Sequence, residues 1–150
     1  GRDNVEIFGV NSRLDSLNAE VLSFRLTKLK KIIKRRTKNI QIYKKFIKSK
    51  SVEIINTKNN FIDAHVMFIT LCDKRDKLKN YLSKYGIQSL VYYKTPLHLH
   101  KATRFLGYKK GDFPVAEKLV KKVLAFPHHQ NLSEKEIKFV AKKIDNFYEN

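Results

Sequence analysis

At the head of a long apolar-striped segment stands the sequence Gly9-Val10-Asn11-Ser12-Arg13-Leu14-Asp15-Ser16-Leu17-Asn18-Ala19. Gly9 permits a close approach of the backbone to a neighbouring group. Asn11 offers both donors and acceptors, and the planar guanidinium of Arg13 suits phosphate or carboxylate. These residue types, placed just ahead of a helix, favour contacts with an anion and an amide. The alternative is an ordinary helix N-terminus with a polar lead-in.

A single amphipathic helix is predicted to follow this stretch and to end near Lys50. Its apolar positions recur at spacings of three and four residues, with Arg36 in the one gap of the series. This stripe consists of Leu22, Leu26, Leu29, Ile33, Ile40, Tyr43 and Ile47. A second apolar strip near the start consists of Leu14, Leu17, Val21 and Phe24. We therefore expect the start of the helix to face another surface as well as the core.

The middle of the chain changes from loop to strand, helix and strand. Residues 52–61 are polar and rich in Asn, which predicts a loop. The elements predicted after it are a strand at 65–71, a helix capped by Asp73 and ended by Gly86, and a strand at 87–93. The inner face of the helix is predicted to hold Leu78, Tyr81, Leu82 and Tyr85.

Two helices are predicted in the C-terminal third. Pro114 suits the first turn of the earlier helix, and Pro127 stops it. Its apolar face comprises Leu119, Val120, Val123 and Leu124. Ser133 and Glu136 form a capping box that opens the terminal helix. The buried face of that helix comprises Ile137, Val140, Ala141, Ile144 and Phe147.

These elements predict an α/β fold, in which the long helix packs with a small sheet and C-terminal helices follow. We expect the sheet to be antiparallel, although a short helix between the two strands leaves their direction open. Residues 1–50 are expected to form the lead-in and long helix, and residues 51–150 a small α/β domain. We expect the two parts to make one structural unit.

Composition limits the class of protein and its partners. The 150 residues contain no apolar run near the ~20 needed to span a bilayer, and the one cysteine, Cys72, fits a reducing compartment. A cytoplasmic protein is therefore expected. The net charge of +18 is compatible with binding to nucleic acid or an anionic membrane. Because lysines are spread over almost every segment, solvated surfaces are favoured over a nucleic-acid-binding module, which stays an alternative.

A second candidate site lies at Tyr92-Tyr93-Lys94-Thr95-Pro96-Leu97-His98-Leu99-His100, where a predicted strand meets a loop made rigid by proline. Imidazole and phenol groups at a strand end are typical of functional loops, and a surface loop that covers the core is the alternative. The pair His98-x-His100 lacks the further ligands that zinc requires, and adjacent His128 and His129 tend to point apart. We expect no metal site.

Four stretches together resemble the DegT/DnrJ/StrS family of sugar aminotransferases, which depend on pyridoxal 5'-phosphate (PLP). They are Gly9-x-Asn11-x-Arg13-Leu14-Asp15 followed by Asn18-Ala19, Arg75-Asp76-Lys77-Leu78, the aromatic-x-x-Pro-Leu-His step that ends at His98, and Gly107-Tyr108 with Gly111-Asp112-Phe113-Pro114-Val115-Ala116-Glu117. The resemblance implies the small C-terminal domain of a fold-type I enzyme.

The resemblance also implies roles for particular residues. Asn11 corresponds to a residue that reaches across a dimer interface to the PLP phosphate of the partner subunit, and Arg13 would assist with anion binding. Tyr92 and His98 would face the sugar nucleotide. This sequence departs from the family pattern at Tyr92, where His is usual, and at Lys94, where Pro is usual. Both departures bear on substrate specificity.

Transamination by PLP needs a lysine that forms a Schiff base, a carboxylate opposite the pyridine nitrogen and a phosphate cradle. In the resembling family the lysine, the carboxylate and most of the cradle precede the Gly-x-Asn-x-Arg segment, so the large PLP domain is expected to be absent here. We therefore expect the C-terminal part of an aminotransferase for a nucleotide-linked ketosugar, inactive alone. It would bind PLP only together with the missing large domain or with a partner chain. The expected partner is a second copy in a homodimer or a separate N-terminal catalytic half. A non-catalytic dimerisation or interaction domain is a further alternative.

Overall fold

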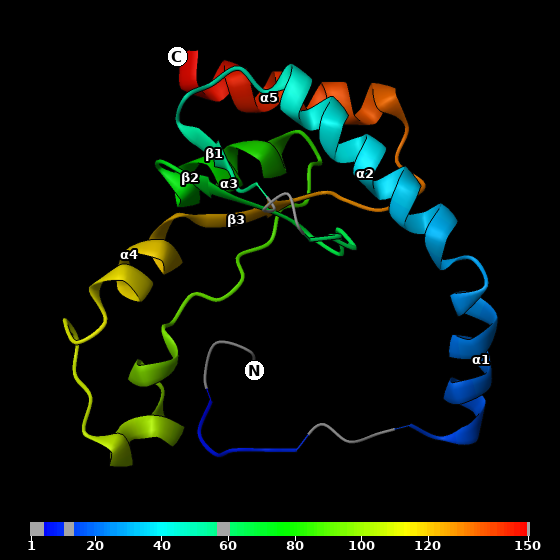
Figure 1. Cartoon of the computed structure of the whole chain (residues 1–150). Coiled ribbons are helices and arrows are strands. Elements are labelled where there is room, and N and C mark those ends of the chain that lie inside the picture. Colours follow the sequence, from blue (N-terminus) through cyan, green and yellow to red (C-terminus); the bar gives the residue numbers. More distant parts are fainter. Residues whose placement is uncertain (1–4, 11–13, 57–60, 150) are drawn as a thin grey trace.

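The computed structural model describes residues 5–10, 14–56 and 61–149. Figure 1 shows a small sheet in the middle of the molecule, with α2 and α5 crossing on one side of it. The elements in chain order are α1 (Ser16–Leu26), α2 (Leu29–Phe46), β1 (Val52–Ile54), β2 (Phe68–Cys72), α3 (Arg75–Lys84), the 3₁₀ helices η1 (Leu97–Leu99) and η2 (Lys101–Leu106), α4 (Pro114–Lys122), β3 (Val123–Phe126) and α5 (Glu134–Glu149).

The sheet is antiparallel, which confirms the expected strand direction. Its order is β1-β2-β3, with Val52 opposite Cys72 and Phe68 opposite Phe126. Along β2 every second side chain is buried, including Thr70, as expected for a strand with one covered face. The Thr70 Oγ1 donates a hydrogen bond of 2.9 Å to the Leu124 carbonyl oxygen, which ties β2 to β3 through a side chain.

The core lies between the sheet and a layer of helices. Helix α2 packs against α5, and α3 contacts α5, β2 and β3. The terminal helix buries the face that the sequence predicts, apart from Phe147, which is half-buried. The largest apolar side chains with no solvent exposure are Tyr43, Leu78, Leu82, Leu124, Ile137 and Ile144.

Tyr43 joins α2 to the loop after β3, and we expect Tyr43→Phe to lower the free energy of unfolding by about 1–2 kcal/mol. The ring stacks on Phe68 at 4.7 Å, and the phenol donates a 2.8 Å hydrogen bond to the Pro127 carbonyl oxygen. Burial raises the pKa of the Tyr43 phenol, in agreement with a dry site. Urea denaturation measures the loss. Tyr93→Phe removes the same oxygen from a side chain that is 64% exposed and is expected to cost little; equal losses would contradict the role of the buried bond.

The prediction of one continuous helix from the start of the stripe to Lys50 is wrong. The helix breaks between α1 and α2, where the Thr27 hydroxyl donates a 2.7 Å hydrogen bond to the Phe24 carbonyl oxygen. The Lys28 backbone N–H bonds to the Arg25 carbonyl oxygen in a tighter turn. Threonine hydroxyls that bond to the preceding turn compete with the regular helical pattern, and here the bond accompanies the tighter turn that ends α1.

The strand predictions need three corrections. Residues Val52–Ile54, predicted as loop, form β1. Residues 87–93, predicted as a strand, contribute only an isolated bridge between Leu90 and Ala125. The helix predicted to continue to Pro127 ends at Lys122, and Val123–Phe126 form β3 instead. For β1 and β3, pairing with the distant strand β2 decides the backbone conformation, which local apolar spacing does not reveal.

The helix ends are partly as predicted. The capping box is confirmed, since the Glu136 backbone N–H bonds to the Ser133 Oγ and the Ser133 N–H bonds to the Glu136 carboxylate. Pro114 begins α4, and Gly86 follows α3 with a φ of 71°. The prediction that Asp73 caps α3 is wrong, because Lys74 occupies that position and Asp73 accepts from the Lys122 ammonium at 2.7 Å.

Helix α1 leaves its apolar side chains bare. None of its residues is buried, and Figure 1 shows it extending away from the sheet and the α5 layer. The start of the helical segment thus presents apolar side chains that the described residues do not cover, and the expected second surface stays a prediction. Within the described ranges no helix combines the length and apolar character required to cross a membrane.

Candidate functional site

The N-terminal arm, residues 5–10, lies against the loop that contains the second candidate motif. The Val5 backbone N–H donates to the His100 Nδ1 at 3.3 Å, and the Ala102 N–H donates to the Val5 carbonyl oxygen at 3.0 Å. The Lys101 ammonium also meets a Glu6 carboxylate oxygen at 3.1 Å. The structure thus brings together two segments that lie 95 residues apart in the sequence.

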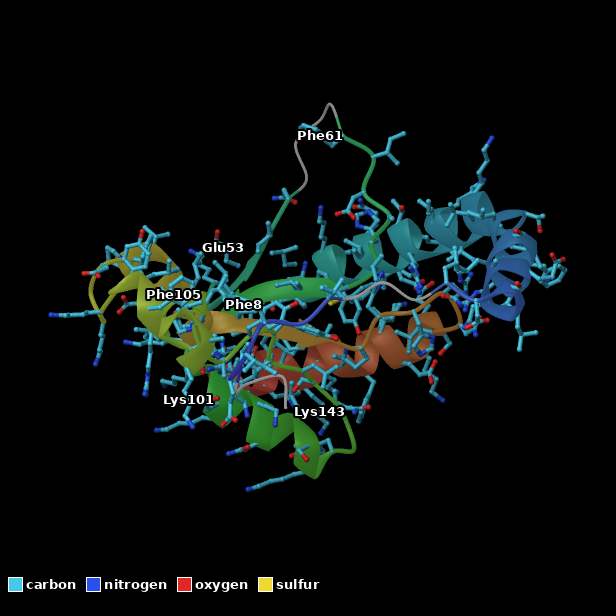
Figure 2. All side chains as sticks on the ribbon, turned by 90° about the horizontal axis from the view of Figure 1, so that it is seen from below. Phe8, Glu53, Phe61, Lys101, Phe105 and Lys143 are labelled. Atoms are coloured by element: carbon cyan, nitrogen blue, oxygen red, sulfur yellow. The ribbon has the colours of Figure 1, made fainter. Side chains whose placement is uncertain are left out.

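An exposed aromatic contact continues this arrangement. The rings of Phe8 and Phe105 meet edge to face with centroids 6.3 Å apart, and both labels lie close together in Figure 2. The predicted cofactor-binding residues Asn11 and Arg13 follow directly in the chain but lie outside the described residues. The structure therefore places the segment that leads to them and not their side chains.

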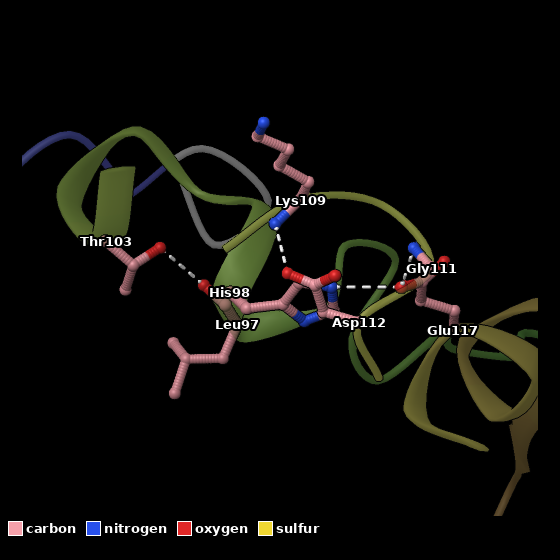
Figure 3. A network of polar contacts seen from close by, with 7 residues as sticks. All are labelled: Leu97, His98, Thr103, Lys109, Gly111, Asp112 and Glu117. Carbon is pink, nitrogen blue, oxygen red and sulfur yellow. Dashed lines mark hydrogen bonds and ion pairs between the residues drawn. The ribbon is translucent and has the colours of Figure 1, made fainter. Parts of the chain in front are cut away.

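His98 is held inside a hydrogen-bonded loop rather than on an open strand end. Its side chain is buried, and its Nε2 lies 3.1 Å from the Glu117 Oε1 at the start of α4. The same carboxylate oxygen accepts a 2.7 Å hydrogen bond from the Gly111 backbone N–H, as Figure 3 shows. The imidazole packs on the Phe113 ring, with 4.7 Å between centroids. One carboxylate thereby fixes both the imidazole and the turn before α4.

Further backbone contacts stabilise this loop. The Thr103 hydroxyl lies within hydrogen-bond distance of the Leu97 carbonyl oxygen, at 2.8 Å, and the Lys109 N–H donates to the Asp112 carboxylate at 2.7 Å. The Gly111 hydrogen bond and, next, the contact with His98 hold the pKa of the Glu117 carboxyl below its ordinary value. Glu117 is therefore ionised at neutral pH and serves as the acceptor for the His98 Nε2–H.

Removing the Glu117 carboxylate should loosen the Gly111 turn. We expect Glu117→Ala to speed amide hydrogen exchange at Gly111 by roughly fivefold or more, because that N–H loses its acceptor. Glu117→Gln keeps one acceptor oxygen and should have a smaller effect. Exchange measured by NMR tests both variants, with Lys118→Ala as the control on the exposed side of the same turn. An unchanged rate in Glu117→Ala would show that the bond does not protect this turn.

Tyr92 occupies a different place from His98. It is half-buried and lines a cavity of about 280 Å³ together with Gln88, His128 and His129. His98 is not among the residues that line this cavity. His98 therefore lies in the same loop as His100, which contacts the N-terminal arm. Tyr92, the other residue predicted to face the substrate, lines a cavity that does not include His98.

Two residues of the site were missed as candidates from the sequence. Glu117 was recognised only as part of a motif, although its position in the first turn after Pro114 points it back toward the preceding loop. His100 anchors the arm through its ring nitrogen, for which the sequence carries no local signal. Within the described ranges no three side chains of His, Cys, Asp or Glu gather as a metal site.

Comparison with known proteins identifies the family. The DegT/DnrJ/EryC1/StrS aminotransferase family matches residues 1–145. The chain belongs to this family. Members of the family are PLP-dependent aminotransferases, and the small antiparallel sheet with its helices is the α/β fold of part of a fold-type I domain.

Individual relatives show how much of such a protein this chain represents. The erythromycin biosynthesis sensory transduction protein EryC1 of Saccharopolyspora erythraea is 38% identical over 129 residues, which are 85% of this chain and 35% of that protein. The dTDP-3-amino-3,6-dideoxy-alpha-D-galactopyranose transaminase of Aneurinibacillus thermoaerophilus is 27% identical over 93% of this chain and 38% of its own length.

A solved structure agrees over nearly the whole chain. The crystal structure of S. venezuelae DesV, in complex with a ketimine intermediate, matches with a TM-score of 0.87 and 27% identity, over 97% of this chain and 39% of DesV. The chain thus spans less than two fifths of the length of these aminotransferases.

The setting of the described lysines bears on how PLP could be held. A lysine that forms a Schiff base needs a setting that lowers its pKa, usually burial away from water. No lysine in the described ranges is buried, and the pKa of Lys122 is raised by its hydrogen bond and ion pair with Asp73.

Proposed function

We propose that this chain is the C-terminal part of a PLP-dependent aminotransferase that acts on a nucleotide-linked ketosugar. Such a reaction serves amino-sugar biosynthesis for surface polysaccharide or related glycans. The observation that carries the proposal is the family match over residues 1–145, in a chain that covers 35–39% of its relatives. The name of the transaminase relative, which specifies a dTDP-linked amino sugar, supports a nucleotide sugar as substrate.

We further propose roles for the residues that the family motifs single out. Asn11 contacts the PLP phosphate of a partner subunit, and Arg13 assists in binding the anion. Tyr92 and His98 face the sugar nucleotide, with Glu117 holding the His98 imidazole in one orientation. The contacts between the arm and the His100 loop support this proposal, because they hold Val5, a few residues ahead of the cofactor motif, beside the end of the substrate motif.

The proposed cytoplasmic enzyme is assembled either as a homodimer or from this chain and a separate N-terminal catalytic half. The exposed apolar side chains of α1 and its flanks support an assembled state, since a large apolar surface marks a contact with another polypeptide. These side chains are Leu14, Leu17, Val21, Leu22, Phe24, Leu26 and Leu29.

We expect the 150-residue chain alone to give no transamination and no borohydride-reducible bond to PLP. The physical reason is that every described lysine is exposed or half-buried, whereas an amine that attacks an aldehyde efficiently needs burial or a neighbouring group that activates it. Absorbance near the visible edge after adding PLP, followed by borohydride treatment and mass spectrometry, measures the adduct. A stoichiometric adduct on one lysine, formed at PLP concentrations equal to the protein, would contradict the proposal.

A non-catalytic interaction domain is the second candidate, and the bare face of α1 is the observation that favours it. Gel filtration and mixing with a polypeptide that carries the lysine-bearing half separate the two candidates. Restored transamination supports the aminotransferase, whereas a stable complex or dimer without activity supports the interaction domain.

A further inference from the structure

A groove of about 800 Å³ lies between the start of α2 and the loop that precedes α5. Its cationic lining comes from Lys28, Lys31, Lys34, Arg35 and Lys38. These residues fall on one side of the helix, because their spacings of three and four residues bring successive side chains to neighbouring positions. The groove therefore concentrates positive charge in a concave place.

This charge is not balanced by the helix that carries it. Helix α2, LKKIIKRRTKNIQIYKKF, has eight basic side chains and no acidic one. Like charges at these spacings repel one another, so the arrangement weakens the helix unless an anion is present. None of the ion pairs found among the described residues includes a cation of the groove.

The nearest acidic side chains are already engaged. Glu134 pairs with Lys138 at 2.7 Å, and this contact is the main cause that lowers its pKa, with smaller effects from Lys38 and Lys45. Glu136 is bound to Ser133 in the capping box. Arg35 makes one long contact, from its Nη2 to the Leu132 carbonyl oxygen at 3.5 Å.

The remaining lining is suited to a small polar ligand. Ile32 adds an apolar side chain, while Gln130 and Asn131 add amide groups from the facing loop. The buried Gln130 Oε1 has no hydrogen-bond partner within the described part of the chain, so this oxygen is free to accept a hydrogen bond from a hydroxyl or N–H group of a ligand. The volume lies in the range of small-molecule sites.

We propose that this groove binds a compact anion with two or more phosphate groups. Several cations within reach of one another neutralise neighbouring phosphates better than a single charge. A single-stranded nucleic acid is the less favoured ligand, because the residues that line the groove include no aromatic platform for bases, and the neighbouring Phe24 ring is covered on one face by the Lys28 ammonium at 4.2 Å. The proposal holds whether or not the chain takes part in transamination.

Calorimetric titration of the 150-residue chain with tripolyphosphate tests the site. One variant combines Lys31→Gln, Lys34→Gln and Lys38→Gln. Each substitution removes one contact between a lysine and a phosphate, which should weaken binding about two- to fivefold. We therefore expect roughly a tenfold or larger rise in Kd. The matched control combines Lys84→Gln, Lys118→Gln and Lys142→Gln, which remove the same charge from exposed positions outside the groove, and should change Kd less than about twofold.

The outcomes separate a site from diffuse attraction. Equal weakening in the two triple variants, or tighter binding of a single-stranded oligonucleotide than of tripolyphosphate, would overturn the proposal. A nucleoside triphosphate that binds like tripolyphosphate supports recognition of phosphate alone, and tighter binding supports added contacts with the nucleoside. NMR of the wild-type chain tests the location of the site without any substitution. Shifts of the Gln130 and Asn131 side-chain amides on titration support the site, and their absence overturns it.

Discussion

Leu82→Ala is expected to lower the free energy of unfolding by about 3 kcal/mol, within the ~2–5 kcal/mol typical of buried leucines. Leu82 has no solvent exposure and lies on α3, which contacts α5, β2 and β3. Truncation removes apolar burial and leaves a cavity that those elements cannot easily fill, because each is fixed by other contacts. In a chain of this size the loss is a large part of the total stability.

The matched control makes the same chemical change on the surface. Leu97 on η1 is 68% exposed, so Leu97→Ala should cost less than about 0.5 kcal/mol. Urea denaturation of both variants, monitored by circular dichroism, gives the two values. Similar losses would mean that the layer around α3 is not the cooperative core.

The prediction of the α3 face shows what apolar spacing can and cannot reveal. Leu78 and Leu82 are buried as predicted, and Tyr81 is partly buried. Tyr85 was also placed on the inner face, but its side chain is 43% exposed and the Lys143 ammonium lies 3.6 Å from its ring centroid. Spacing identifies the side of a helix that faces inward, whereas the extent of the neighbouring layer decides where burial stops.

The errors concentrate where pairing between distant strands decides the conformation. Val123–Phe126 reads equally well as the end of an apolar helix face or as a short strand. Its partner is β2, more than 50 residues earlier, with Leu71 opposite Val123. In contrast, the capping box at Ser133 is a local interaction, and the sequence was sufficient to place it.

In the candidate site, too, local motifs were recognised from the sequence and contacts between distant residues were not. The family motifs pointed to His98 and to the segment with Asn11 and Arg13, and the structure places the arm that leads to this segment beside the His100 loop. The bond from Glu117 to His98 spans 19 residues and depends on how α4 folds back, so local patterns did not predict it. The roles of Asn11, Arg13, Tyr92 and His98 stay predictions that need the assembled enzyme.

His128 is expected to make the protein less stable as the pH falls from about 6.5 to about 4. Burial, the largest cause, lowers the pKa of the His128 imidazole from 6.5 to about 4, and the charges of Arg36, His65 and His129 act in the same direction. A backbone contact with His65 opposes the shift. The ring is thus neutral when folded, whereas the unfolded chain takes up a proton below pH 6.5, so acid favours unfolding.

Replacing this ring isolates its share of the acid sensitivity. A full shift corresponds to roughly 3 kcal/mol, and partial solvent exposure of the ring reduces the expected value to about 2 kcal/mol. Urea denaturation at pH 7.5 and pH 4.5 should show that wild type loses about 2 kcal/mol more than His128→Phe across this window. Protonation of carboxylates whose pKa is also lowered, such as Glu134, destabilises both proteins equally and cancels in the comparison. His129→Phe alters the exposed neighbour and should behave like wild type; if it removes the pH dependence instead, the buried ring is not its source.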